Sequence, residues 1–324
     1  MRFTIVIPMK NMADYVGQTL DSILSQDYED LEVLAIDDGS TDGSMDVVRR
    51  RNDPRVQAIA NPGKGWPDAF NHGVAIATGD YVSKCDADDL YPTGRVATQA
   101  KYLADHPEYD AVSGYMAFIT SDGRDVVTLD EYPPEPIDFT ERMRGGEVPG
   151  HNCAIAFRTE VMRQTGGARG FFRTCGDIDM CARFADHGRV LYCPYLAYVA
   201  RLHDSSLTRS RPVSELAWFG EQVERFCKQR AETETDDLMR NDPPVEPKHE
   251  GPGIKRSAAT AARELIFGRA WAAIRQSDAT TARLYARRLL PYVVQNPASA
   301  GEWLRLAKSA WLNNGRSAKA GATA

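Results

Sequence analysis

Long apolar runs, paired cysteines and a glycine-rich phosphate loop are all missing from this sequence. Its longest apolar runs are short, such as residues 3–7, far below the roughly 20 residues that cross a bilayer, and no signal-peptide pattern precedes them. The six cysteines contain no C-x-x-C pair, so neither a structural zinc site nor a disulfide framework is indicated. We therefore expect a cytoplasmic globular protein with reduced thiols, whose N-terminus enters the fold directly.

The segment after the first expected strand reads Pro8-Met9-Lys10-Asn11. No G-x-G-x-x-G lies there, which disfavours a dinucleotide oxidoreductase. A sugar nucleotidyltransferase also ranks low, because such an enzyme normally needs a glycine-rich phosphate loop at this position.

The net charge of −6 is unevenly distributed along the chain. Residues 254–324 carry 12 Lys and Arg against 3 Asp and Glu, a charge of +9, so the other 253 residues carry −15. An acidic body argues against nucleic acid as the main partner. The basic tail is suited to contact either acidic lipid or the acidic body itself.

Short apolar runs alternate with helical patterns over the first 120 residues or so, which is typical of a parallel sheet with crossover helices. Beyond about residue 111 the pattern is mixed. The fold class expected is α/β, with a mostly parallel central sheet flanked by helices. Strands are expected at 3–7, 31–36, 56–59, 81–84, 112–119, 125–129, 153–157 and 190–192, and helices near 16–24, 69–77 and 177–186.

Composition divides the chain into four parts. A catalytic domain is expected over 1–211 and a connecting helix over 212–227. Residues 228–253 are acidic and rich in proline without apolar periodicity, which predicts a mobile linker. Three amphipathic helices are expected in the basic appendage, 254–324.

Acidic residues follow two of the expected strands. In open α/β sheets ligands bind outside the carboxyl ends of the strands, so these residues are candidates for function. Asp37 and Asp38 come first, and a carboxylate there can accept hydrogen bonds from the N–H groups of a nucleobase. The alternative is a turn and helix cap, for which the sequence Asp-Gly-Ser-Thr-Asp is well suited.

The second acidic cluster is Asp86-Ala87-Asp88-Asp89. Crowding three carboxylates at a strand end is unfavourable unless a positive charge joins them. Mg²⁺ and Mn²⁺ prefer oxygen ligands, and an extended backbone would point Asp86 and Asp88 to the same side. The alternative is a solvated acidic turn.

A third constellation, Gly176-Asp177-Ile178-Asp179 followed by Arg183, lies at the start of an expected helix. Asp177 there is explained equally by a helix cap. Combined with the other two clusters it becomes a candidate base that deprotonates an acceptor hydroxyl.

The ordered set of these motifs resembles the family 2 glycosyltransferases over about the first 210 residues. The set comprises Ile7-Pro8 with Asn11, Asp37 to Asp42, Asn71 with Gly73, Gly79 to Val82, Asp86 to Asp89, and Gly176-Asp177 with Arg183. The resemblance implies a GT-A fold and an inverting transfer from a nucleotide-diphosphate sugar, usually with Mn²⁺ or Mg²⁺. It further suggests a glycan or lipid-linked acceptor, at the inner face of a membrane if the basic tail binds lipid.

The same resemblance implies a role for each matching residue. Asp177 would be the base, and Asp88 the direct metal ligand, with Asp86 near the ribose or a metal-bound water. Donor contacts would come from Pro8, Asp37, Asp38 and Lys64, a late contact to metal or phosphate from His203, and the acceptor side from His151 and Asp179. A catalytically silent nucleotide-sugar-binding module remains the alternative.

Overall fold

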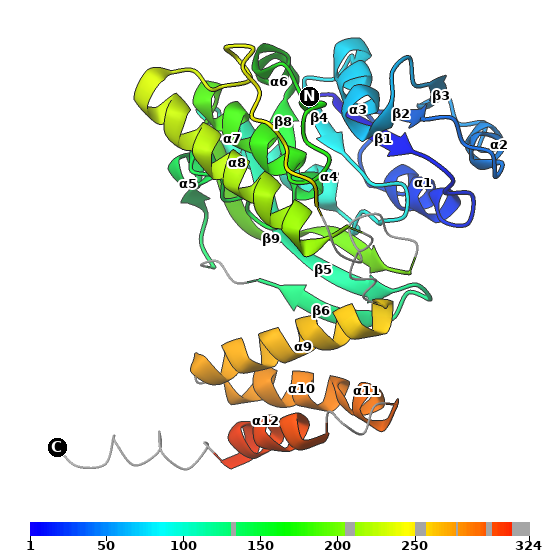
Figure 1. The fold of residues 1–324 in the computed structure, drawn as a ribbon. Helices are drawn as coiled ribbons and strands as arrows, with labels where there is room; N and C mark the ends of the chain where they lie inside the picture. Colours follow the sequence, from blue (N-terminus) through cyan, green and yellow to red (C-terminus); the bar gives the residue numbers. More distant parts are fainter. Residues whose placement is uncertain (131–133, 205–210, 250–256, 277, 296–299, 313–324) are drawn as a thin grey trace. The chain divides into compact units, whose positions relative to one another are not determined.

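The computed structural model describes residues 1–130, 134–204, 211–249, 257–276, 278–295 and 300–312 (Figure 1). It divides into two compact units. Unit 1 comprises Met1–Met116, Asp130–Ala200 and Arg211–Ile254, and unit 2 comprises Ala117–Leu129, Arg201–Ser210 and Lys255–Ala324.

Four parallel strands begin unit 1, in the spatial order β3-β2-β1-β4. They are β1 (Phe3–Met9), β2 (Leu31–Asp37), β3 (Val56–Ala60) and β4 (Tyr81–Lys84), and the intervening helices are α1 (Val16–Leu24), α2 (Ser44–Arg49) and α3 (Gly65–Ile76). The expected parallel sheet is thus confirmed. β1 runs two residues past its expected end, because Pro8 loses one donor but stays paired in register with Ile36.

The sheet continues from β4 as β8-β5-β9-β7. β8 is antiparallel to both β4 and β5, as is β7 to β9. The strands are β5 (Ala111–Thr120), β7 (Ile137–Asp138), β8 (Ala156–Arg158) and β9 (Val190–Leu202). The strand expected at 153–157 begins later, because residues Asn152–Ala154 form a single 3₁₀ turn instead.

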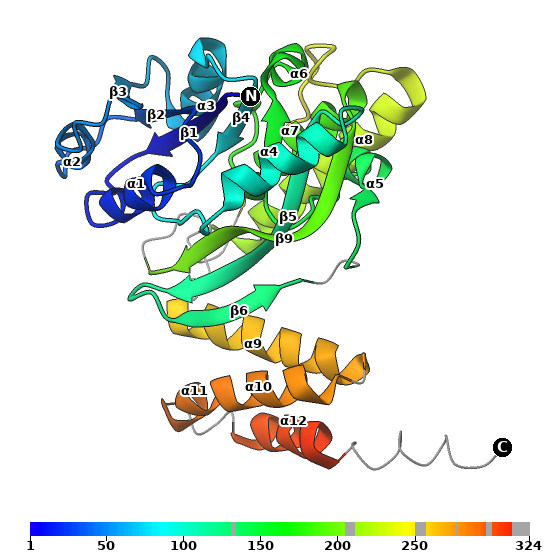
Figure 2. The same ribbon diagram turned by 180° about the vertical axis from the view of Figure 1, so that it is seen from behind.

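Helices cover both faces of this part of the sheet. α7 (Gly176–His187) and α8 (Val213–Thr233) lie on one face, and α4 (Arg95–Asp105) lies on the other (Figures 1 and 2). The short helices α5 (Thr140–Arg144) and α6 (Thr159–Thr165) complete the unit. Its core is apolar and fully buried around Val6, Phe70, Phe157 and Phe184.

α3 approaches β1 very closely at Gly73. A Cβ atom at this position would lie 2.4 Å from Cγ1 of Val6, so only glycine permits the contact. This close packing helps to fix the carboxyl ends of the parallel strands, where the acidic motifs are found.

Residues 228–249 are not the free linker that composition predicts. α8 ends at Thr233, six residues beyond the expected end of the connecting helix. Asp236, which follows it, is fully buried and accepts hydrogen bonds from Arg169 Nη1 at 2.8 Å and Arg230 Nη1 at 2.9 Å. Its charge therefore ties this acidic segment to unit 1.

Unit 2 has its own apolar core, built by β6 (Asp125–Leu129) and the C-terminal helices. Four helices replace the three expected ones: α9 (Ala258–Arg275), α10 (Ala279–Arg288), α11 (Leu290–Gln295) and α12 (Ala300–Leu312). Tyr285 accepts a hydrogen bond from the backbone of Thr128, and Arg288 donates one to the carbonyl of Val126. Residues 117–129 and 201–210, expected in the catalytic domain, thus belong with the basic helices. None of the helices in the described ranges is long and apolar enough to cross a membrane.

Removing the carboxylate of Asp236 should destabilise unit 1. Asp236→Ala removes a buried acceptor that two guanidinium groups share, and breaking such a network typically costs about 3–5 kcal/mol. Chemical denaturation should show this loss, whereas Asp242→Ala, at an exposed position of the same segment, should change stability by less than about 0.5 kcal/mol. Equal stability of the two variants would mean that the segment is not anchored through Asp236.

Candidate functional site

The acidic cluster after β4 forms a tight turn. The backbone N–H of Asp89 donates to the carbonyl of Asp86 at 3.2 Å, which closes a four-residue turn. The expected extended backbone, with Asp86 and Asp88 on one side by strand alternation, is therefore wrong. Asp89 is buried, while Asp86 and Asp88 are half-buried.

Tyr198 of β9 holds this turn in place. Its hydroxyl accepts a hydrogen bond from the backbone N–H of Asp86 at 3.0 Å and donates one to Oδ2 of Asp89 at 2.7 Å. Its ring stacks on the imidazole of His151 with centroids 5.6 Å apart. One carboxylate oxygen of Asp89 is therefore engaged by Tyr198. The same tyrosine side chain joins β9, the acidic turn and the segment that carries His151.

Lys84, the last residue of β4, places a buried positive charge beside Asp86. Its Nζ atom forms an ion pair with Oδ1 of Asp86 and lies 3.5 Å from Sγ of Cys153. Burial opposes the charged ammonium, but the neighbouring Asp86 carboxylate outweighs it and raises the pKa of Lys84. Burial likewise opposes the Asp86 carboxylate, and the charge of Lys84 nevertheless holds the pKa of Asp86 below its usual range.

His151 begins the 3₁₀ turn at residues Asn152–Ala154, and its Nδ1 atom accepts a hydrogen bond from the backbone N–H of Cys153 at 3.2 Å. Burial lowers the pKa of His151. Three carboxylates, those of Asp86, Asp177 and Asp88, act on the same imidazole in the opposite direction. Charges interact appreciably over roughly 10 Å, so all three carboxylates lie in the neighbourhood of this imidazole.

Asp177 lies in the first turn of α7, where it is half-buried. The helix begins at Gly176, which is buried against two aromatic residues. A Cβ atom on Gly176 would lie 2.9 Å from Cβ of Phe172 and 3.3 Å from Cζ2 of Trp66. Close packing there therefore fixes the position from which Asp177 emerges.

Asp38 organises the loop that leads into α3. Its Oδ1 atom accepts hydrogen bonds from Asn61 Nδ2 at 2.8 Å and from the backbone N–H of Gly65 at 2.9 Å. Partial burial opposes its ionisation, yet these bonds and the Lys10 ammonium lower the pKa of Asp38. Lys64 lies in the same loop with an exposed side chain.

Asp37, unlike Asp38, has a carboxylate oxygen that is left without a hydrogen bond in the described part of the chain. Its Oδ2 atom accepts from the backbone N–H of Ser40 at 3.1 Å. Its Oδ1 atom is buried without a hydrogen-bond partner among the described residues. A buried carboxylate oxygen normally has a partner, so this atom is suited to a ligand's N–H group. Pro8 lies in the adjacent strand β1, half-buried.

Two further predicted site residues, Asp179 and His203, are buried. Asp179 is fully buried beneath α7 and is bound by the guanidinium groups of Arg169 and Arg183. The expected acceptor-side role of Asp179 is therefore wrong, because the helix turns its side chain into the protein interior. His203 follows β9, belongs to unit 2 and is buried.

Sequence reasoning missed Lys84, Cys153 and Tyr198. A lysine in the otherwise buried strand β4, just before an acidic cluster, was the one available signal. Cys153 and Tyr198 are brought to the site by segments some 70 and 110 residues away from Asp86, as the spacings of their hydrogen bonds record. No local pattern in the sequence marks them.

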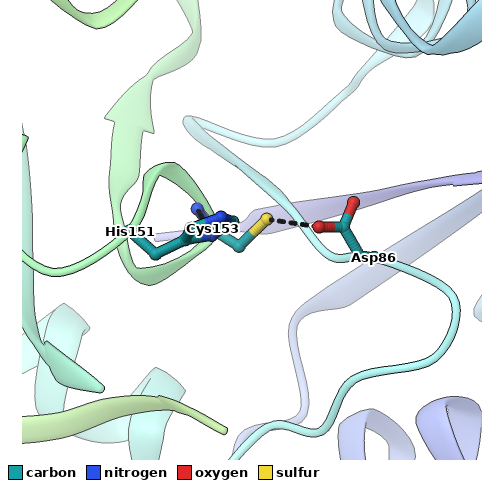
Figure 3. A group of neighbouring side chains, drawn as sticks. All are labelled: Asp86, His151 and Cys153. Atoms are coloured by element: carbon teal, nitrogen blue, oxygen red, sulfur yellow. Dashed lines mark hydrogen bonds between the residues drawn. The ribbon is translucent and has the colours of Figure 1, made fainter. Parts of the chain in front are cut away.

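Asp86, His151 and Cys153 form a group in which one potential ligand atom from each lies within 4.8 Å of the others (Figure 3). Cys153 Sγ donates to Oδ2 of Asp86 at 3.6 Å. Asp88, the predicted metal ligand, is not one of these three residues.

Comparison with known families gives a match to the model for "Glycosyl transferase family 2" over residues 4–166, half of the chain. Putative glycosyltransferase EpsE of Bacillus subtilis is 29% identical over 194 residues, which span 58% of this chain and 68% of EpsE. Glycosyltransferase GlyA of Streptococcus pneumoniae is 32% identical over 124 residues, covering 38% of this chain but only 18% of GlyA.

Two solved structures resemble the fold. TarS of S. aureus, solved in complex with UDP, superposes with a TM-score of 0.57 at 16% identity, covering 75% of this chain and 68% of that one. The mannosyltransferase PcManGT from Pyrobaculum calidifontis, solved with GDP-Man and Mn²⁺, gives 0.51 at 23% identity, covering 96% and 87%. These likenesses show that the fold is GT-A.

Tyr198→Phe should loosen the acidic turn. The change removes the acceptor of the Asp86 N–H and the donor to Asp89, and leaving buried polar groups unpaired costs roughly 1–3 kcal/mol. Thermal unfolding should show a lower Tm. Tyr115→Phe, in which the lost hydroxyl makes no hydrogen bond within the described structure, should leave Tm nearly unchanged. A Tyr198→Phe protein as stable as this control would argue against the bridging role.

Proposed function

The chain belongs to glycosyl transferase family 2, and we propose that it transfers a sugar from a nucleotide-diphosphate sugar to an acceptor hydroxyl, with inversion and with the help of a divalent cation. The observation that carries this proposal is that Asp86 lies beside His151 and that the charges of Asp86, Asp88 and Asp177 all act on that imidazole. These acids come from two stretches of chain some 90 residues apart, the turn after β4 and the start of α7.

The donor would occupy the carboxyl ends of β1, β2 and β4. The unpartnered Oδ1 atom of Asp37 supports a hydrogen bond to an N–H group of the nucleobase, beside the Pro8 backbone. Asp38 would hold the loop that presents Lys64 to the diphosphate. The solved neighbours contain UDP, UDP-GlcNAc and GDP-Man, which makes a nucleotide-diphosphate sugar the natural class of donor.

Asp88 would be the direct ligand of Mn²⁺ or Mg²⁺, with Asp86 near the ribose or a bound water. The oxygen chemistry of these carboxylates fits such ions. When bound, the ion would offset the negative charge that builds on the leaving diphosphate. The neighbouring Lys84 keeps Asp86 ionised and so ready for that role.

Asp177 would act as the general base. Its carboxylate would accept the proton of the acceptor hydroxyl while the acceptor oxygen forms a bond to the anomeric carbon. The bond from that carbon to the diphosphate breaks in the same displacement, so the configuration inverts. His151, beside Asp86, would line the acceptor side of the centre.

We further propose that the acceptor is a glycan or lipid-linked glycan met at the inner face of a membrane, with the basic helices of unit 2 as the contact. Arg305 and Lys308 of α12 are exposed, and neither forms an ion pair within the described structure. Leu304 and Trp311 of the same helix are exposed apolar residues. Exposed cations beside apolar side chains suit an anionic lipid surface.

Replacing the proposed base should abolish turnover and preserve donor binding. Asp177→Asn removes the proton acceptor while keeping size and shape, so transfer should slow by about 10²–10⁴-fold. Release of the nucleoside diphosphate from candidate sugar donors, with Mn²⁺ present, measures this rate. Asp46→Asn, an exposed carboxylate on α2, provides a control of equal charge change and should keep full activity.

Donor binding is measured separately as a thermal shift, since a ligand that binds the folded state raises Tm. Full transfer by Asp177→Asn would overturn the assignment of the base. Donor binding without any sugar transfer or donor hydrolysis by the unaltered protein would instead favour a silent binding module.

Neutralising α12 should weaken association with anionic vesicles. Arg305→Gln together with Lys308→Gln removes two charges, each worth about 1 kcal/mol near an anionic surface, so binding should fall by roughly 30-fold. Co-sedimentation with phosphatidylserine-containing vesicles measures this. Arg50→Gln with Lys228→Gln, two exposed cations of unit 1, is the matched control. Equal binding by both double variants would refute the membrane contact.

A further inference from the structure

We propose that Asp86, His151 and Cys153 form a second metal site, selective for Zn²⁺ and inhibitory, which competes with the oxygen-ligated site at Asp88. The binding part of this inference stands on the geometry of the three side chains alone. Only the inhibitory consequence rests on the proposed glycosyl transfer.

The three side chains offer a carboxylate oxygen, an imidazole nitrogen and a sulfur. Their ligand atoms lie within 4.8 Å of one another, and Sγ of Cys153 is already 3.6 Å from Oδ2 of Asp86 (Figure 3). Tetrahedral Zn²⁺ holds its ligands at about 2.0–2.3 Å, which separates neighbouring ligand atoms by roughly 3.3–3.8 Å. Side-chain movements of about 1 Å would therefore bring the three ligand atoms to the spacing of a zinc site.

The composition of the group selects the metal. Thiolate and imidazole ligands favour Zn²⁺, whereas Mg²⁺ and Mn²⁺ favour carboxylates, carbonyls and water. Three protein ligands leave a fourth position for water, as in open zinc sites. Asp86 is the shared member, so zinc held there would remove it from the proposed ribose or metal-water contact.

The backbone makes the arrangement partly preformed. The His151 imidazole is stacked on Tyr198, and the backbone carbonyl of Cys153 accepts a hydrogen bond from Arg95 Nη2 at 2.7 Å. Cys153 is fully buried and His151 half-buried, so their ligand atoms have little freedom to move apart. Such preorganisation favours binding of an ion that matches the group.

Lys84 is the resident cation of this group. Its Nζ atom contacts both Asp86 and Cys153, which is where a metal ion would have to sit. Zinc binding therefore requires that the ammonium move away and that the Cys153 thiol release its proton to solvent. The lysine thus acts as the competitor that keeps the group empty at low zinc concentration.

The test uses the full chain with metal alone as the probe. Competition with a chromophoric chelator measures Zn²⁺ affinity, and Co²⁺ substitution reports thiolate ligation through the sulfur-to-cobalt charge-transfer absorption in the near ultraviolet. Cys153→Ser should abolish that absorption and weaken Zn²⁺ binding by more than about 10-fold, the smallest effect typical even of losing an outer partner of a metal ligand. Cys193→Ser, a buried cysteine of β9 outside the group, should change neither.

A loss of Zn²⁺ binding in Cys153→Ser could also come from a folding defect. Lys84→Met avoids this ambiguity, because its expected result is stronger Zn²⁺ binding. Removing the competing ammonium should tighten Zn²⁺ binding by about 10-fold or more and strengthen the cobalt absorption. Absence of sulfur ligation in both the unaltered protein and Lys84→Met would overturn the site. If sulfur ligates the metal but Zn²⁺ does not slow release of the nucleoside diphosphate, only the inhibition is overturned. If the protein transfers no sugar but still binds Zn²⁺ through Cys153, the proposed function fails and the metal site stands.

Discussion

The ion pair between the buried Lys84 and the half-buried Asp86 at the end of β4 is the interaction on which the site depends. A carboxylate in this position is disfavoured by burial, and its charge persists because an ammonium lies against it. The pair also draws in Cys153, and through it the turn that carries His151. Strand β4, the 3₁₀ turn and β9 are thereby joined at one point.

A second network of charged side chains stabilises α7 from the protein interior. Arg169 binds both Asp179 and Asp236, and Arg183 and Arg230 complete the network beneath α7. Asp179, Asp236, Arg183 and Arg230 are all buried. Their effect is to fix the helix whose first turn presents Asp177, and to tie the acidic segment after α8 to the same unit. Two aspartates that sequence reasoning placed on an acceptor surface or in a linker are thus interior anchors.

The same carboxylate serves two chemistries in the proposals made above. With oxygen ligands around it, Asp86 belongs to a site for a hard divalent ion and a diphosphate. With Cys153 and His151 beside it, Asp86 belongs to a softer site that Lys84 keeps closed. Lys84, the last residue of β4, would determine which of the two proposed metal sites Asp86 serves.

Local patterns in the chain predicted the parallel strands β1 to β4, the acidic cluster that follows β4 and the start of α7, because apolar periodicity and turn residues act over a few neighbouring positions. They also identified Asp37, Asp86, Asp88 and Asp177 as candidates, since each follows a strand or opens a helix. They were wrong about the extended Asp86–Asp88 segment, the direction of Asp179 and the free state of residues 228–249. Those features depend on which distant arginine or tyrosine meets each carboxylate.

What the sequence determined by itself was therefore the order of the elements and the residues that could carry chemistry. Tertiary structure decided which of those carboxylates are partly exposed and which are interior, because a buried charge takes its role from its partner. It also decided that Lys84, Cys153 and Tyr198 meet at the acidic turn, since contacts across some 70 to 110 residues are made only when the sheet has closed.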